Sequence, residues 1–259
     1  MLFLITNKKT FQVAPPTCSK KCIFTIDMKK YLKSLLLAVL PLAITACSFS
    51  FNGEVVVGNG VEVTKTIDVQ PVTAIVVAGS MDVVYMQGPQ SVVLTADENL
   101  AELYTVEEID GVLHISMKSG YSVFPKVKTF VAVSSETLSK IKVSGSGDCD
   151  IKGTLRTDGD FVFSVSGSGD LEADAIVCNS FDGHINGSGD IEVDALTADS
   201  VNLTINGSGD IKLGCKDAGD INARINGSGD IVLSGKARSL NSKVNGAGDI
   251  STGGLQLMP

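Results

Sequence analysis

The sequence predicts an all-β protein dominated by a β-helix, a solenoid in which each coil has about 20 residues. The motif Gly-Ser-Gly-Asp recurs along the C-terminal half, and successive aspartates are 22, 20, 20, 20 and 19 residues apart. Apolar residues alternate with polar ones on both sides of the motif, which is the period-2 pattern of half-buried strands. A fixed period built from short strands is typical of coils that stack on one another. The motifs end at Asp148, Asp170, Asp190, Asp210, Asp230 and, as Gly-Ala-Gly-Asp, at Asp249.

Aligning the coils on the motif predicts which residues form the core. No coil can bury its apolar face alone, so equivalent residues of neighbouring coils should stack in columns about 4.8 Å apart. One column follows the aspartate, a second precedes the turn, and a third consists of small residues at a tight corner. These columns are Leu171, Ile191, Ile211, Ile231 and Ile250; Ile185, Ile205, Ile225 and Val244; and Cys178, Ala198 and Ala218.

The turns combine glycines, which adopt positive φ at little steric cost, with polar side chains that can bond along the stack. The asparagines before the turns are predicted to form an amide ladder: Asn186, Asn206, Asn226 and Asn245. The aspartates have two interpretations. Each carboxylate either accepts a backbone N–H of its own turn, as in an Asx-turn, or contributes to a calcium row. The candidate metal row is Asp170, Asp190, Asp210 and Asp230, but one carboxylate per coil with no second acidic column beside it favours the Asx-turn.

The N-terminus carries the pattern of an export signal. Residues 28–46 combine basic residues at Lys29 and Lys30 with a short apolar run from Leu35 to Ile44, which is too short to cross a bilayer. Small residues then precede Cys47 and resemble a bacterial lipobox, which implies that Cys47 becomes the acylated first residue of the mature chain. Residues 1–27 fit no secretory pattern and are interpreted as a mis-called upstream extension.

Removal of the leader makes the chain strongly acidic. Residues 1–46 hold seven Lys and one Asp, so of 21 basic and 29 acidic residues the mature chain keeps 14 and 28, a net charge of −14. Such a charge argues against nucleic acid as a partner. The remaining cysteines, Cys149, Cys178 and Cys215, lie on different coils and are predicted to be buried thiols, because neither a CxxC motif nor a zinc spacing is present.

The mature chain is predicted to begin with a tether and leading strand over residues 47–72, followed by one solenoid domain over residues 73–255. Within this domain, residues 73–143 are irregular coils that cap the stack, and residues 144–255 carry the repeats. Residues 98–106 are predicted as either a short helix or an extended bend. Asp110-Gly111 predicts a hairpin turn.

Several motifs together carry a family resemblance. They are A-G-S-x-D-V from Ala78, V-x-L-T-A-D-E-N-L from Val92, D-G-x-L-x-I from Asp110, and the repeated I-N-G-S-G-D. From about Thr73 to Gly248 the chain resembles the "putative auto-transporter adhesin, head GIN domain" family. This resemblance implies a right-handed parallel β-helix in a bacterial cell envelope, and it transfers no ligand or catalytic residue. Two extra residues near Cys149-Asp150 depart from the pattern and predict a bulge there.

The chain is not predicted to be an enzyme. Polysaccharide cleavage on similar β-helices needs carboxylates and a catalytic Arg or Lys together on one face, whereas Arg156, Arg224 and Arg238 occupy different column positions. His184 aligns with Thr204 of the next coil and should point outward into solvent. The chain contains no Trp, so a sugar-stacking platform is poorly supplied.

The predicted function is that of a lipid-anchored binding or structural module of the bacterial cell envelope, acting in adhesion. The alternatives are a polysaccharide lyase or hydrolase and a calcium-stabilised scaffold. The expected partners are the membrane, through Cys47, and a glycan or protein ligand; no cofactor and no nucleic acid are expected. The outer membrane is the expected location, with the periplasmic and surface-exposed faces both open.

Overall fold

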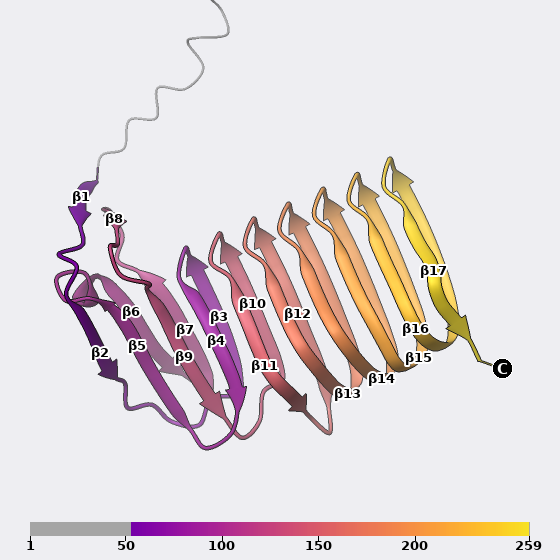
Figure 1. The fold of residues 1–259 in the computed structure, drawn as a ribbon, viewed down its shortest axis with the longest axis horizontal. Helices are drawn as coiled ribbons and strands as arrows, with labels where there is room; N and C mark the ends of the chain where they lie inside the picture. Colours follow the sequence, from indigo (N-terminus) through magenta and orange to yellow (C-terminus); the bar gives the residue numbers. More distant parts are fainter. Residues whose placement is uncertain (1–52, 259) are drawn as a thin grey trace, which may run out of the picture. The chain divides into compact units, whose positions relative to one another are not determined.

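The computed structural model describes residues 53–258, which form a β-solenoid of about six coils with about 20 residues per coil (Figure 1). The predicted upstream extension, the signal peptide and Cys47 lie outside the described residues. The irregular N-terminal part contains β1 (Glu54–Val57), β2 (Glu62–Thr66), β3 (Ala74–Gly79), β4 (Asp82–Gln87), β5 (Ser91–Asp97), the 3-10 helix η1 (Ala101–Leu103), β6 (Tyr104–Ile109), β7 (Val112–Met117), β8 (Tyr121–Phe124), β9 (Phe130–Ser135) and β10 (Lys140–Gly145). The repeat part contains β11 (Cys149–Arg156), β12 (Asp160–Gly167), β13 (Leu171–Gly187), β14 (Ile191–Gly207), β15 (Ile211–Gly227), β16 (Ile231–Gly246) and β17 (Ile250–Leu257).

Each regular coil is one long strand that pairs in parallel with the coils on either side. The register of β14 places Ile191 beside Leu171 on one side and Ile211 on the other. Ile211 is fully buried between its neighbours. The pairing confirms all three predicted columns. Val244, at the end of the second column, is 40% exposed because no further coil of the described chain covers it.

The alternation of inward and outward side chains changes phase twice in each regular coil. In β14, residues 194–195 both face outward between the buried Val193 and Leu196, and residues 199–200 repeat this pattern after the buried Ala198. Each phase change turns the chain while keeping apolar residues inside. The small third column therefore lies just before the second corner, as the sequence predicts.

Neighbouring coils approach each other closely at the Gly-Ser-Gly-Asp turn. Gly207 has a φ of +148°, and a Cβ added there would lie 2.0 Å from the carbonyl oxygen of Gly187. A Cβ at Gly209 would lie equally close, at 2.0 Å, to the carbonyl oxygen of Gly189. Both glycines are therefore required by the spacing of the coils, and the first also by its backbone conformation.

The first repeat coil holds its two extra residues elsewhere than predicted. The pairing of β11 with β13 is regular at Cys149-Asp150, and the bulge lies between Ile151 and Thr154, where Gly153 has a φ of +78°. The other extra residue lies in the turn over residues 157–159, between β11 and β12. The bulge prediction was correct in kind but wrong in position. Cys149 must stay in register because it joins Leu171 of the first core column to Val83 of β4.

The N-terminal part starts the same solenoid and then closes it. Gly79 of β3 pairs with Gly145 of β10 in the same register as the later turns, which makes residues 78–82 a degenerate copy of the repeat. Beyond these coils, β5 runs antiparallel to β2 and β9, and β6 and β7 form an antiparallel hairpin. Asp110 and Gly111 form its predicted turn, with φ of 53° and 80°. Residues 98–106 contain both predicted possibilities, because η1 leads directly into β6.

A buried carboxylate fastens this cap. Asp97 is fully buried, and its two oxygens accept backbone N–H bonds from Gly60 at 2.7 Å, Lys126 at 2.9 Å and Val127 at 3.2 Å. Burial acts to raise the pKa of Asp97, but the three backbone bonds outweigh it, and the pKa is lowered from its ordinary value. Asp97 thereby joins the loop before β2 to the loop before β9.

Candidate functional site

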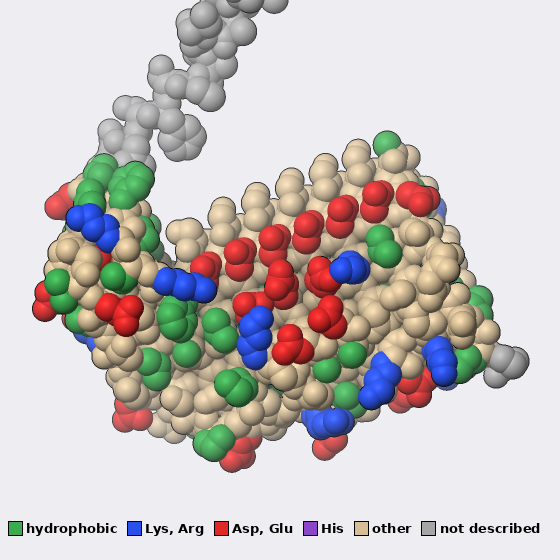
Figure 2. All heavy atoms as spheres, in the orientation of Figure 1, with side chains coloured by type: hydrophobic (Ala, Val, Ile, Leu, Met, Phe, Trp, Pro, Cys, Tyr) green, Lys and Arg blue, Asp and Glu red, His purple; other side chains and the backbone are tan. Residues whose placement is uncertain are grey.

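The aspartate row forms a ladder that runs from coil to coil. Oδ1 of Asp190 accepts the backbone N–H of Asp210 at 2.7 Å, and Oδ1 of Asp210 accepts that of Asp230 at 2.7 Å. The same bond, from the later aspartate to the earlier one, recurs along the whole row. Figure 2 shows a line of acidic side chains along the coils. The carboxylates that accept these bonds are Asp82, Asp148, Asp170, Asp190, Asp210 and Asp230, over distances of 2.7–3.1 Å.

This geometry corrects the Asx-turn prediction. The N–H groups on either side of the aspartate have backbone partners in other coils: that of Ser208 donates to the carbonyl oxygen of Gly187 and that of Ile211 to the carbonyl oxygen of Asp230, both at 2.9 Å. The N–H that remains for a carboxylate is that of the aspartate in the next coil. In-register stacking places this donor beside the carboxylate, so each aspartate stabilises its neighbour's turn instead of its own.

A second acidic column lies beside the ladder, contrary to the sequence-based expectation. Asp150, Glu172 and Glu192 are in register on successive coils, and Lys212 continues the column. Lys212 pairs with Glu192, and Lys152 lies 3.1 Å from Asp150. Burial, followed by the charge of Asp150, raises the pKa of Glu172. Even so, no group of three or more His, Cys, Asp or Glu side chains within residues 53–258 is placed to hold a metal ion.

Amide ladders also cross the coils. The predicted ladder is confirmed, with amide bonds of 2.8–2.9 Å joining Asn186, Asn206, Asn226 and Asn245. A second ladder was missed. It joins Asp182, Asn202, Asn222 and Asn241 over 2.8–3.4 Å. Aligning the coils also on these positions would have revealed it.

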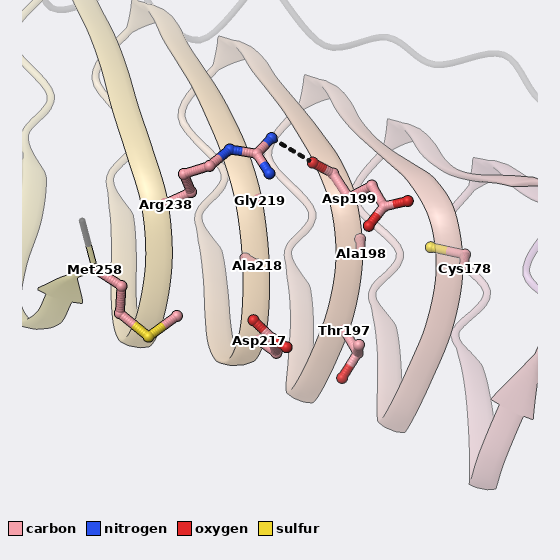
Figure 3. Close-up of a pocket in the computed structure, with 9 residues that line it drawn as sticks. All are labelled: Cys178, Thr197, Ala198, Asp199, Asp217, Ala218, Gly219, Arg238 and Met258. Carbon is pink, nitrogen blue, oxygen red and sulfur yellow. Dashed lines mark hydrogen bonds between the residues drawn. The ribbon is translucent and has the colours of Figure 1, made fainter.

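A groove of about 350 Å³ crosses the corner formed by the small residues (Figure 3). Cys178, Ala198 and Ala218 lie along its floor. The other lining residues are Thr197, Asp199, Asp217, Gly219, Arg238 and Met258. Small residues occupy this corner in four successive coils, since Ala237 is in register with Ala218.

Arg238 is held in place at the groove by two carboxylate bonds. Its Nε and Nη2 donate to Oδ1 and Oδ2 of Asp220 at 3.0 and 2.6 Å. Nη2 also lies 3.5 Å from the carbonyl oxygen of Asp199, across Gly219 (Figure 3). A Cβ on Gly219 would lie 1.8 Å from the carbonyl oxygen of Asp199 and 3.1 Å from Nη2, so only glycine fits between the neighbouring coil and the guanidinium. The bonds from Arg238 and Ser239 lower the pKa of Asp220 to about 2.

The remaining predicted residues form no reactive site. The three cysteines are free and buried, as predicted, and burial raises the pKa of Cys178 to about 12 and of Cys215 to about 11. Burial raises the pKa of Cys149 as well. His184 is in register with Thr204, as predicted, although it is half-buried.

The fold agrees with what the comparisons with known proteins show. A profile of the family described as "putative auto-transporter adhesin, head GIN domain" matches residues 71–197 and 184–258. The chain belongs to this family. No curated protein matches it. Within residues 53–258, no helix is long and apolar enough to span a bilayer.

Solved structures share the fold. A "putative adhesin" from Bacteroides fragilis is 21% identical, with a TM-score of 0.63, over 75% of this chain and 98% of its own. A "putative lipid binding protein" from Parabacteroides distasonis is 22% identical, with a TM-score of 0.63, over 76% and 99%. A "putative adhesin" from Parabacteroides distasonis is 25% identical, with a TM-score of 0.55, over 76% and 99%. The family and the fold fit a binding or structural module of the cell envelope or surface.

Proposed function

We propose that the chain is a lipid-anchored adhesion module that is held in the bacterial envelope by acylated Cys47 and binds its ligand in the Arg238 groove. The groove carries this proposal, because it combines an apolar floor with polar side chains at its edge. A volume of about 350 Å³ falls within the range of roughly 300–1,000 Å³ that small-ligand sites occupy. The lipobox-like sequence before Cys47 supports the anchor.

The charges of the groove favour a neutral or cationic glycan as the ligand. Arg238 is already paired with Asp220, so the carboxylates of Asp199 and Asp217 dominate the free surface. Carboxylates accept hydrogen bonds from sugar hydroxyl or amino groups, whereas an acidic sugar would be repelled. The small floor residues leave room for a ring to lie over them.

A glycan array probed with the mature protein tests the ligand. Binding is expected to neutral or amino sugars and to be lost in Arg238→Ala and in Asp217→Ala. Lys243→Ala is the matched control, because this exposed residue of β16 is not among those that line the groove. Binding that survives both groove variants, or that prefers acidic sugars, would contradict the groove as the ligand site.

Metabolic labelling with a fatty-acid probe tests the anchor separately. The wild type should be labelled and Cys47→Ser should not, and equal labelling of both would end the lipid-anchor proposal. Antibody access to whole cells would then show whether the module faces the medium. Neither the described structure nor the comparisons support the lyase or the calcium-scaffold alternative.

A further inference from the structure

The first and eighth strands form a small sheet of their own, apart from the stacked coils (Figure 1). β1 and β8 pair in parallel, with Val55 opposite Ser122 and Val57 opposite Phe124. Because side chains alternate along a strand and paired residues share a face, Val55, Val57 and Phe124 all point to one side of this ribbon. We call these three residues the apolar ribbon face.

The apolar ribbon face is unusually exposed. Val55, Val57 and Phe124 are 59%, 53% and 57% exposed, whereas Val56 and Val123, on the opposite face, are half-buried. Figure 2 shows hydrophobic side chains gathered at this end of the molecule. Apolar side chains that cluster at the surface, instead of being scattered singly, mark an interaction site.

The ribbon is fixed to the cap by hydrogen bonds. The N–H of Gly58 donates to the carbonyl oxygen of Phe124 at 2.9 Å, which extends the pairing of the strands. The side-chain amide of Asn99 donates to the carbonyl oxygen of Val57 at 2.9 Å, and its Oδ1 accepts the N–H of Asn59 at 2.9 Å. The apolar face is therefore presented in a defined orientation.

The position of the ribbon in the chain identifies what covers it. Gly53, the first described residue, follows Cys47 by six residues, a length of chain that spans at most about 20 Å. An acyl chain on Cys47 would therefore hold β1 close to the bilayer surface. Exposed Lys126 and Lys128 follow Phe124, and side chains of this type extend their amines into the headgroup layer.

We propose that the apolar ribbon face rests in the headgroup layer of the membrane that holds acylated Cys47. This inference depends on the lipid anchor proposed above. The ribbon supplies a second membrane contact beside the acyl chains and orients the coils relative to the bilayer. Because apolar side chains make the contact, it should persist at high ionic strength.

Fluorescence quenching by lipids labelled in their acyl chains tests the contact. The acylated protein on phosphatidylcholine vesicles would carry a fluorophore at Ser122→Cys, which lies on the apolar ribbon face, or at Ser251→Cys in the last strand. The buried native thiols, with raised pKa values, should react slowly with the label. Quenching is expected at position 122 and not at position 251, and equal quenching at both positions would overturn the proposal.

A triple variant separates the ribbon from the anchor. Val55→Ser, Val57→Ser and Phe124→Ser together should abolish quenching at position 122, whereas Val232→Ser, an exposed valine of β16, should not. If Cys47 is not acylated, a hexahistidine tag in place of residues 1–47 and nickel-chelating lipids supply the tether, and position 122 must still be quenched. An unquenched probe on tethered protein would overturn the ribbon contact alone. A dimer in solution that the triple variant abolishes would assign the ribbon to a second copy instead.

Discussion

The regular coils of residues 171–246 and the cap of residues 54–143 share one solenoid but are stabilised in different ways. In the coils, the ladder contacts join equivalent residues of neighbouring coils and recur about every 20 residues, as for the aspartates and asparagines. In the cap, single residues make contacts that occur once, such as the three backbone bonds of Asp97. In the coils, many similar bonds each contribute a small part of the free energy of unfolding, whereas in the cap a few bonds contribute most of it.

Disrupting a core column should have the largest effect. Ile211→Asp places a charge between Ile191 and Ile231 in a fully buried position, so the surrounding coils should fail to fold. Ile211→Ala should cost about 2–5 kcal/mol in the free energy of unfolding. Circular dichroism and chemical denaturation measure both variants. Val232→Asp, on the outward face of the next coil, is the control and should fold; an Ile211→Asp protein with unchanged melting would refute the register.

Removing the carboxylate that fastens the cap should have the next largest effect. Asp97→Asn leaves an oxygen but no charge for three backbone N–H groups, so the cap should open before the coils. Since the pKa of Asp97 is lowered in the folded protein, its stabilisation is complete above the ordinary carboxyl pKa and is lost as the pH falls through the lowered value. Hydrogen exchange measured against pH should show this acid loosening of the cap in the wild type.

The exposed Asp68→Asn is the matched control for the cap and should retain the acid loosening. Asp97→Asn should already be loosened at neutral pH and depend less on acid. A variant whose profile parallels that of the wild type would show that Asp97 does not fasten the cap.

Single changes in the aspartate ladder should have small effects on the free energy of unfolding, because each bond is one of several equivalent ones. Asp210→Ala removes one exposed bond to the N–H of Asp230 and should cost about 1 kcal/mol in the free energy of unfolding. Asp210→Asn keeps an oxygen acceptor and removes one of several stacked charges, so its melting temperature should match or exceed that of the wild type. An Asn variant as unstable as the Ala variant would mean that the charge itself stabilises the ladder.

Calcium should have the smallest effect. One oxygen of each carboxylate from Asp82 to Asp230 accepts a backbone N–H, and calcium needs at least about six oxygen ligands. The melting temperature should therefore be the same with added calcium and with a chelator. A rise with calcium that disappears in Asp210→Ala would make the row a metal site after all.

The sequence predicts the coils well because their contacts repeat with it. The columns through Ile191, Ile205 and Ala198 follow from the period alone, and so does the ladder through Asn206. The hydrogen-bond donor to each aspartate could not be predicted from the period. A carboxylate near a turn has two N–H groups within reach, one in its own turn and one in the next coil, and only the backbone bonds of the coils decide between them.

Features that depend on one residue could not be predicted. Asp97 contacts backbone groups that are 29, 30 and 37 residues away, and nothing in the sequence around it marks these partners. The groove depends on Gly219 lying between Asp199 and Arg238, on consecutive coils. An alignment of the outward positions would have shown a glycine at position 219, where the neighbouring coils carry Asp199 and Arg238.

The in-register columns also limit how such a chain can change in length. Leu171, Ile191 and Ile211 are equivalent positions, so deletion of residues 191–210 would join Asp190 to Ile211 and leave every column continuous. Duplication of one coil would do the same and would lengthen the stack by about 4.8 Å. A chain built in this way can gain or lose height in whole coils, whereas the cap, whose contacts occur once, offers no equivalent positions at which to add or remove a unit.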